Sequence, residues 1–244
     1  MTVIITDEML AGIPSLVFRS HSESTVPAPL IVLFQRFTVT KELDANLGYV
    51  LAKAGFDVVC PEAHHHGSRF DGDEQKRLSQ FWPILRQTLE ELPQVIEACG
   101  EQGIGDIRRI GVFGSSMGGF AVCGAMMRYP WIQAGAAYMG GGFFAHAMEF
   151  VHPPQWAEKQ ACAHHLSPYD AQHHVAQLVG RPLFLWHGAQ DTVVSCAETE
   201  KLRDTLVNIK GDGQLTCVID PHGTHKITQS SVTRGVDFML QHLL

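Results

Sequence analysis

Short apolar runs alternate with longer stretches of helical periodicity along most of this 244-residue chain. The short runs are rich in β-branched and aromatic residues and end at Gly, Pro, Asp or His, as strands do. They predict strands at Ile13–Arg19, Leu30–Gln35, Phe56–Cys60, Ile107–Phe113, Ala134–Met139, Leu183–His187 and Leu215–Ile219. The longer stretches predict helices at Leu43–Ala54, Gln75–Cys99, Met117–Tyr129, Glu198–Asn208 and Gln229–Leu243.

Two of these strands, Leu30–Gln35 and Leu183–His187, have long uninterrupted apolar runs instead of alternating apolar and polar residues. Such runs are typical of strands in a parallel sheet that helices cover on both faces. The alternation of strands and helices therefore predicts a doubly wound α/β fold. We expect a mostly parallel sheet of about eight strands, flanked by helices.

Residues 140–178 interrupt this alternation of strands and helices with three consecutive glycines, several aromatic residues and six histidines. Two interpretations stay open: a small cap inserted above the edge of the sheet, over a pocket, or a plain long loop. We expect residues 1–244 to form one domain that includes this insertion. Within the second predicted helix, Pro93 is expected to break or kink the helix.

Composition narrows the class of protein and its partners. An apolar fraction of 45% is enough for a sizeable core, and a net charge of −7 argues against nucleic acid and anionic membranes as partners. The sequence shows neither a signal peptide nor an apolar window long enough to span a bilayer. Six scattered cysteines, with no Cys-x-x-Cys pair, are typical of a reduced protein. We expect a cytoplasmic monomer or homodimer.

The stretch Gly114–Gly118, Gly-Ser-Ser-Met-Gly, lies between a predicted strand and a predicted helix. It fits the Gly-x-Ser-x-Gly pattern of a nucleophile elbow with Ser116 at its centre. A serine in such a strained turn needs neighbours without side chains two residues away, and the helix start directs N–H groups at developing negative charge. Ser115 does not fit, because Phe113 and Met117 would flank it. The other interpretation is a tight turn of small residues.

A serine hydroxyl needs a base to accept its proton, and the base needs an orienting carboxylate. In this architecture the chain order is Ser, acid, His. Asp191 follows the sixth predicted strand and His225 precedes the last helix, so both are expected at the same edge of the sheet as Ser116. Asp220 and His222 are the alternatives, although both suit a turn.

Three blocks resemble the catalytic blocks of α/β-hydrolases near the dienelactone hydrolase and prolyl-oligopeptidase-like groups: Gly114–Gly118, His187–Asp191 and Thr224–Thr228. Two further segments are similar, more narrowly, to small bacterial carboxylesterases of the YjfP type: Pro61–Asp73 and Arg77–Trp82. The resemblance extends from about residue 13 to the C-terminus and is weakest in 140–178. It implies the α/β-hydrolase fold, with Ser116 as nucleophile, Asp191 as acid and His225 as base.

The resemblance also implies an oxyanion hole formed by the backbone N–H groups of Phe37 and Met117. One departure concerns this site. The resembled esterases usually have His-Gly-Phe after the third strand, where this chain has Gln35, Arg36 and Phe37. Arg36 is a second candidate for this site and for contact with an acidic substrate group. Otherwise it points to solvent or pairs with a nearby carboxylate.

Histidine clusters raise the question of a metal. Three adjacent imidazoles, His64–His66, cannot all face one ion without a contorted backbone, and in the resembled pattern His66 begins a structural loop. The pairs His164-His165 and His173-His174 are expected either to be exposed or to line the mouth of a pocket. We therefore expect no metal. No Gly-x-Gly-x-x-Gly motif with a partner acid follows an early strand, so we expect no organic cofactor either.

The leading prediction is a serine hydrolase that cleaves carboxylic esters of short to medium acyl chain through an acyl-enzyme on Ser116. The aromatic residues of 140–178 and the small helix after Ser116 predict an apolar acyl pocket. One alternative is a thioesterase, or another α/β-hydrolase activity, with the same triad. The alternative from another class is a non-catalytic ligand-binding homologue, which the altered segment at Gln35 and Arg36 favours.

Overall fold

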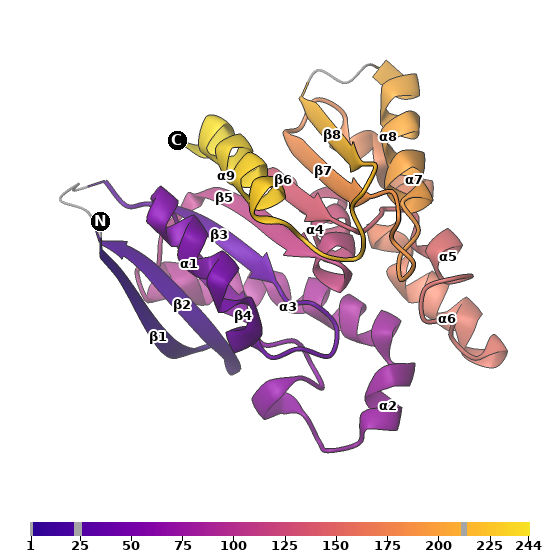
Figure 1. The fold of residues 1–244 in the computed structure, drawn as a ribbon. Helices are drawn as coiled ribbons and strands as arrows, with labels where there is room; N and C mark the ends of the chain where they lie inside the picture. Colours follow the sequence, from indigo (N-terminus) through magenta and orange to yellow (C-terminus); the bar gives the residue numbers. More distant parts are fainter. Residues whose placement is uncertain (1, 22–25, 211–213) are drawn as a thin grey trace.

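A computed structural model describes residues 2–21, 26–210 and 214–244 of the chain. Within these residues an eight-stranded sheet has the order β1-β2-β4-β3-β5-β6-β7-β8 (Figure 1). The strands are β1 Thr2–Leu10, β2 Ile13–His21, β3 Pro29–Phe34, β4 Asp57–Pro61, β5 Asp106–Ser115, β6 Ile132–Tyr138, β7 Leu183–Gly188 and β8 Leu215–Asp220. β2 pairs antiparallel with both of its neighbours, β1 and β4, and every other neighbouring pair in the sheet is parallel. The predicted fold class is confirmed.

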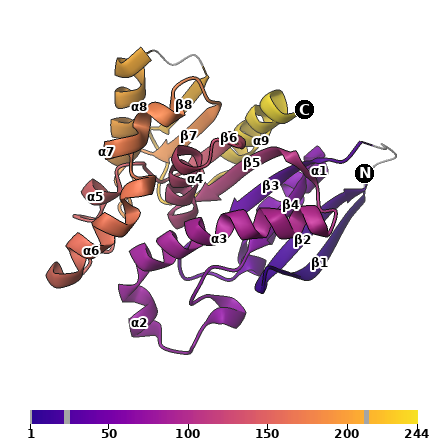
Figure 2. The same cartoon turned by 180° about the vertical axis from the view of Figure 1, so that it is seen from behind.

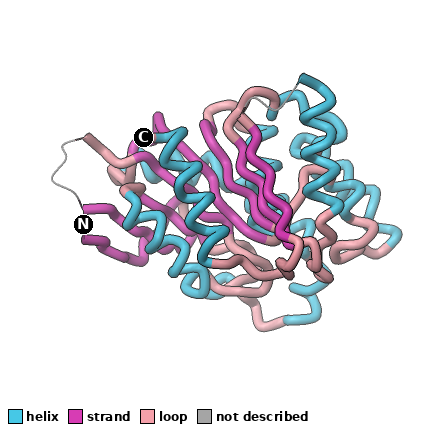
Figure 3. Tube along the Cα trace, turned by 45° about the horizontal axis from the view of Figure 1, so that its top comes forward, coloured by secondary structure: helices cyan, strands magenta, loops and turns pink. Residues whose placement is uncertain are grey.

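Helices cover both faces of the sheet, which runs through the middle of the molecule (Figure 3). α1 Ala45–Ala54 and α9 Gln229–Leu243 lie on one face (Figure 1), and α3 Phe81–Glu101, α4 Met117–Arg128 and α8 Ala197–Lys210 lie on the other (Figure 2). Each face has its own apolar core. β3 is buried at all six positions, which agrees with its uninterrupted apolar sequence.

Two elements differ from those predicted. β1 was not expected, and its side chains explain why: they are mostly exposed or half-buried, and only Leu10 is buried. Such an antiparallel edge strand carries little apolar signal. The second predicted helix is two helices, α2 Glu74–Ser79 and α3, which are interrupted at Gln80.

Pro93 was expected to break or kink the helix; the break is wrong, because α3 continues through this residue, and the kink stays a prediction. A proline has no N–H to donate to the carbonyl four residues earlier, which is that of Leu89. In the structure the Tyr129 hydroxyl donates to the Leu89 carbonyl at 2.8 Å. A side chain from the end of α4 therefore replaces the hydrogen bond that the proline removes.

Residues 140–178 are not a plain loop. They form short helices: α5 Phe144–Ala147, α6 Trp156–Leu166, η3 Ser167–Tyr169, α7 Ala171–His174 and η4 Val175–Leu178. Trp82 on α3 donates through Nε1 to the Val151 carbonyl at 3.0 Å, and the Asp170 carboxylate accepts from the Ala145 N–H at 2.7 Å. The Trp82 bond holds the insertion against α3, whereas the Asp170 bond lies within the insertion. The role of 140–178 as a cap stays a prediction. No helix in the described part of the chain has the length and apolarity needed to cross a bilayer.

Candidate active site

Ser116 stands at the turn between β5 and α4 with φ 57° and ψ −120°, a strained conformation for a residue with a side chain. Its N–H donates to the Tyr138 carbonyl of the neighbouring strand at 2.8 Å. The flanking glycines are required by crowding. A Cβ at Gly114 would lie 2.5 Å from the Gly118 carbonyl oxygen, and a Cβ at Gly118 would lie 2.4 Å from that of Phe34. The Gly-x-Ser-x-Gly stretch therefore adopts the geometry of a nucleophile elbow.

The structure brings Ser116, His225 and Asp191 into one hydrogen-bonded row. His225 Nε2 lies 3.0 Å from Ser116 Oγ, and His225 Nδ1 lies 2.7 Å from Asp191 Oδ2. The alternatives form a local turn of their own, in which the Asp220 carboxylate accepts from the His222 N–H at 3.0 Å. The row has the geometry needed to move a proton from the serine hydroxyl to the imidazole.

Asp191 is fixed by its own turn. Its side chain is fully buried, and its Oδ1 accepts from the N–H groups of Val193 at 2.8 Å and Val194 at 2.9 Å. The N–H of Gln190 donates to the Gly223 carbonyl at 2.8 Å, which ties this turn to the one that carries His225. Oδ2 is left to face the imidazole. Asp191 and His225 are thus set against each other by backbone hydrogen bonds.

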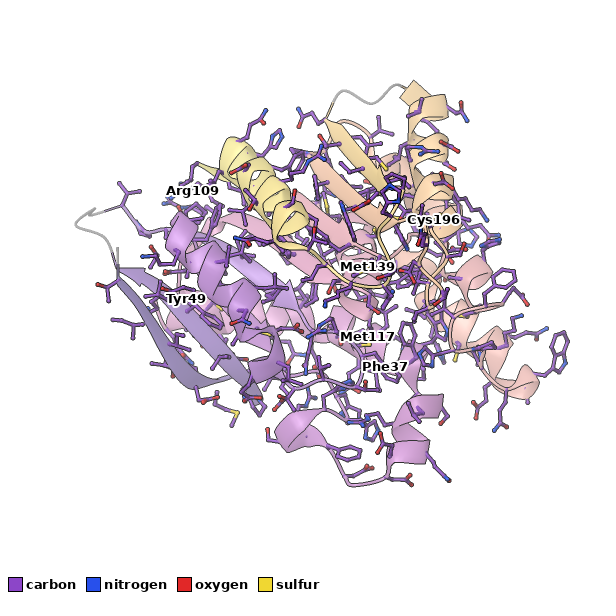
Figure 4. The ribbon with its side chains drawn as sticks, viewed as in Figure 1. Phe37, Tyr49, Arg109, Met117, Met139 and Cys196 are labelled. Atoms are coloured by element: carbon purple, nitrogen blue, oxygen red, sulfur yellow. The ribbon has the colours of Figure 1, made fainter. Side chains whose placement is uncertain are left out.

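The two amides predicted for the oxyanion hole lie at this end of the sheet. Both residues are labelled in Figure 4. Met117 follows Ser116 directly, and Phe37 lines the same cavity as Ser116. Neither backbone N–H donates to an acceptor within the described residues. Free backbone N–H groups beside a serine can donate hydrogen bonds to an oxyanion and stabilise its charge. Their role stays a prediction.

The departure at residues 35 and 36 has a structural explanation. Gln35 is buried, its Oε1 accepts from the Ala63 N–H at 2.8 Å, and its Nε2 donates to the Val39 carbonyl. Arg36 pairs with the buried carboxylate of Asp44 at 2.7 Å, so the carboxylate-pairing alternative is the one observed. Both side chains therefore hold the loop that carries Phe37.

His66 supports the same loop, a role that sequence reasoning missed. The Thr38 N–H donates to His66 Nε2 at 2.7 Å, and His66 Nδ1 lies 2.7 Å from the His64 carbonyl. The ring is therefore neutral, with its proton on Nδ1. It also packs edge-to-face on Phe37 at a centroid distance of 5.7 Å. In the described residues no group of three or more His, Cys, Asp or Glu side chains could hold a metal ion.

The contact of His66 predicts a pH dependence of stability. Burial lowers the pKa of His66 below its ordinary value of 6.5. Above that value the ring is neutral in both the folded and the unfolded chain, so the contact with Thr38 contributes fully. As the pH falls, the unfolded chain takes up the proton first, so the free energy of unfolding decreases between 6.5 and the lowered folded pKa.

We expect His66→Gln, which removes this titration, to lose less unfolding free energy than the wild type between about pH 7.5 and about pH 5. The other histidines are the same in both proteins, so the difference isolates His66. Urea unfolding at the two pH values measures it. Equal losses in the two proteins would contradict the assigned role.

A cavity of about 730 Å³ opens beside Ser116 and His225. Its walls come from the loop after β3, α1, the loop after His225 and the start of α9, and include Leu47, Met139 and Val232. No residue of 140–178 lines it. The insertion instead contacts the loop after β3 that carries Phe37, where the His152 ring lies 4.8 Å from the ring of Phe37.

The fold, the elbow and the row from Ser116 to Asp191 define the class of this protein: it is a serine hydrolase with the α/β-hydrolase fold. More narrowly, the chain belongs to the prolyl oligopeptidase family, whose model matches residues 43–243. It is 34% identical over 246 residues to Esterase YjfP of Escherichia coli (strain K12), covering 98% of this chain and 99% of that protein. The predicted resemblance is confirmed.

Solved structures show the same fold at lower identity. TT1662 from Thermus thermophilus superposes with a TM-score of 0.78 at 20% identity, covering 99% of this chain and 98% of the other. A cold-adapted esterase from an Arctic intertidal metagenomic library gives a TM-score of 0.68 at 15% identity, covering 98% and 93% of the two chains.

Proposed function

We propose that this protein hydrolyses carboxylic esters through an acyl-enzyme on Ser116, with His225 as base and Asp191 as acid. The observation that carries the proposal is the row of contacts in which His225 lies within hydrogen-bond distance of both Ser116 Oγ and Asp191 Oδ2. The similarity to Esterase YjfP supports an ester as the substrate.

In the acylation step, Ser116 Oγ attacks the ester carbonyl carbon while its proton passes to His225 Nε2. The carbonyl oxygen gains negative charge, which the N–H groups of Phe37 and Met117 stabilise by donating hydrogen bonds to it. The bond to the leaving oxygen then breaks, and the imidazolium returns its proton to the departing alcohol. Asp191 stabilises the imidazolium through Nδ1–H throughout.

Deacylation repeats these steps with water as nucleophile. His225 Nε2 accepts a proton from the water as its oxygen attacks the acyl carbon, and then gives that proton to Ser116 Oγ as the acyl bond breaks. The products are a carboxylic acid and an alcohol. A thioester would follow the same steps with a thiol as leaving group.

The cavity supports a substrate with a short to medium acyl chain. Its volume of about 730 Å³ is within the range of small-molecule sites, and Leu47, Val232 and Met139 give it apolar walls. Hydrolysis of p-nitrophenyl esters from acetate to decanoate tests the proposal. We expect activity that peaks at one chain length. No turnover at any length would favour the non-catalytic ligand-binding alternative instead.

Enlarging one wall residue should shift this preference. In Val232→Phe the larger side chain occupies part of the cavity, so we expect kcat/KM for decanoate to fall about tenfold relative to that for acetate. Val207→Phe is the matched control, because Val207 is exposed on α8, away from the cavity. An unchanged chain-length profile in Val232→Phe would show that the acyl chain binds elsewhere.

A further inference from the structure

His187 is a buried imidazole that the proposed mechanism does not use. It is the penultimate residue of β7, and its side chain is fully buried. Its Nε2 lies 2.9 Å from the Val194 carbonyl oxygen and 3.2 Å from Asp191 Oδ2. A carbonyl oxygen can only accept, so Nε2 carries a proton and donates it to the Val194 carbonyl, with the Asp191 carboxylate in close contact beside this bond. Asp191 Oδ2 therefore faces two imidazole rings, that of His225 and that of His187.

The other nitrogen of His187 continues the row. His187 Nδ1 lies 2.7 Å from Thr199 Oγ1 on α8, and Thr199 Oγ1 donates to the Gly140 carbonyl at 2.7 Å. Burial lowers the pKa of His187, which favours the neutral ring. The Val194 carbonyl keeps the remaining proton on Nε2, so Nδ1 is an acceptor. The Thr199 hydroxyl proton then lies between two acceptors, Nδ1 and the Gly140 carbonyl.

The contacts of His187 and Thr199 extend through Gly140 to the turn that carries Ser116. Gly140 follows β6 and packs against the first turn of α4, where a Cβ on Gly140 would lie 2.5 Å from the Gly119 carbonyl carbon. Two residues before it, the Tyr138 carbonyl accepts the N–H of Ser116 at 2.8 Å. From Asp191 the contacts therefore reach Ser116 by two routes, through His225 on one side and through His187 and Thr199 on the other.

We propose that His187 is a positioning residue of this active site: by donating from Nε2 to the Val194 carbonyl in the turn of Asp191, lying against Asp191 Oδ2 and contacting Thr199, it fixes the acid relative to the elbow that carries Ser116. The inference rests on the proposed function of Asp191. His187 does not line the substrate cavity. Its removal should therefore lower kcat and leave KM unchanged, because the turn that carries the acid loses the Nε2–H bond to Val194 and the acid loses its fixed orientation.

Three substitutions separate the hydrogen bond from simple packing. His187→Gln places an amide N–H near the position of Nε2, His187→Asn places one near Nδ1 only, and His187→Phe keeps the bulk with no donor. We expect kcat per active site to fall about 10-fold to about 100-fold in the Asn and Phe variants, with the Gln variant close to the wild type. Titration with a p-nitrophenyl phosphonate counts the active sites, so loss of folded protein does not count as loss of kcat.

Thr199→Val and Thr199→Ser provide a second test if the His187 variants fold poorly. Thr199→Ser keeps the hydroxyl and should retain activity, whereas Thr199→Val removes it and should lower kcat per titrated site. Equal kcat in both Thr199 variants, or in all three His187 variants, would overturn the inference. Failure of the proposed function itself would be visible earlier, as wild-type protein without esterase activity or as activity that survives loss of Ser116.

Discussion

Ser116→Ala should lower kcat for ester hydrolysis by about 10⁶-fold, which is the scale of loss when the nucleophile of a serine triad is removed. The reason is that Ser116 Oγ is the hydroxyl of the elbow that lies 3.0 Å from His225 Nε2, in a residue that lines the cavity. Without it His225 has no hydroxyl to deprotonate, and only the oxyanion donors and substrate binding remain. Steady-state hydrolysis of the preferred p-nitrophenyl ester measures the loss.

Ser115→Ala is the matched control. Ser115 Oγ is buried and has no hydrogen-bond partner among the described residues, so its removal breaks no hydrogen bond. We expect this variant to keep nearly wild-type activity. Comparable losses at both serines would mean that the elbow is damaged by any change. A loss of activity in Ser115→Ala, with none in Ser116→Ala, would assign the role of nucleophile to Ser115 instead.

Asp191→Asn should lower kcat by about 10⁴-fold through the tautomer of His225. Asp191 Oδ1 accepts from the N–H groups of Val193 and Val194, so the amide oxygen of an asparagine must take that position. The NH₂ group then faces His225 Nδ1 and forces it to accept. The imidazole proton moves to Nε2, which can no longer accept the proton of Ser116.

Asp220→Asn tests the competing acid under the same conditions. Asp220 accepts from the His222 N–H in a surface turn, and we expect its substitution to leave kcat near the wild-type value. Full activity in Asp191→Asn together with a large loss in Asp220→Asn would assign the acid to Asp220 instead. Thermal unfolding of both variants separates misfolding from the tautomer effect.

The sequence predicted the features that depend on short segments. The apolar run of β3 indicated a buried parallel strand, and the glycines at 114 and 118 indicated a turn in which backbones approach too closely for side chains. The positions of Asp191 and His225 after their strands placed them at one edge of the sheet. The resemblance to known hydrolases then assigned roles to them. All of these signals are local in the chain.

The features that were missed depend on contacts between distant segments. β1 has little apolar signal because most of its side chains are not buried. Pro93 remains in a helix because Tyr129, far along the chain, bonds the freed carbonyl of Leu89. The bond from Thr38 to His66 and the contact of His187 with Thr199 likewise carry no periodic or spacing signal. The side of Ser116 on which the cavity opens was not predictable for the same reason.

The central claim is that Ser116 is the nucleophile and that His225 activates it. Phosphonate labelling followed by peptide mass mapping tests this claim most directly, because the label remains on the attacking oxygen. We predict one phosphonyl group per chain, on Ser116, with no label in Ser116→Ala and much slower labelling in His225→Ala. A label on Ser115, or undiminished labelling in His225→Ala, would contradict the account.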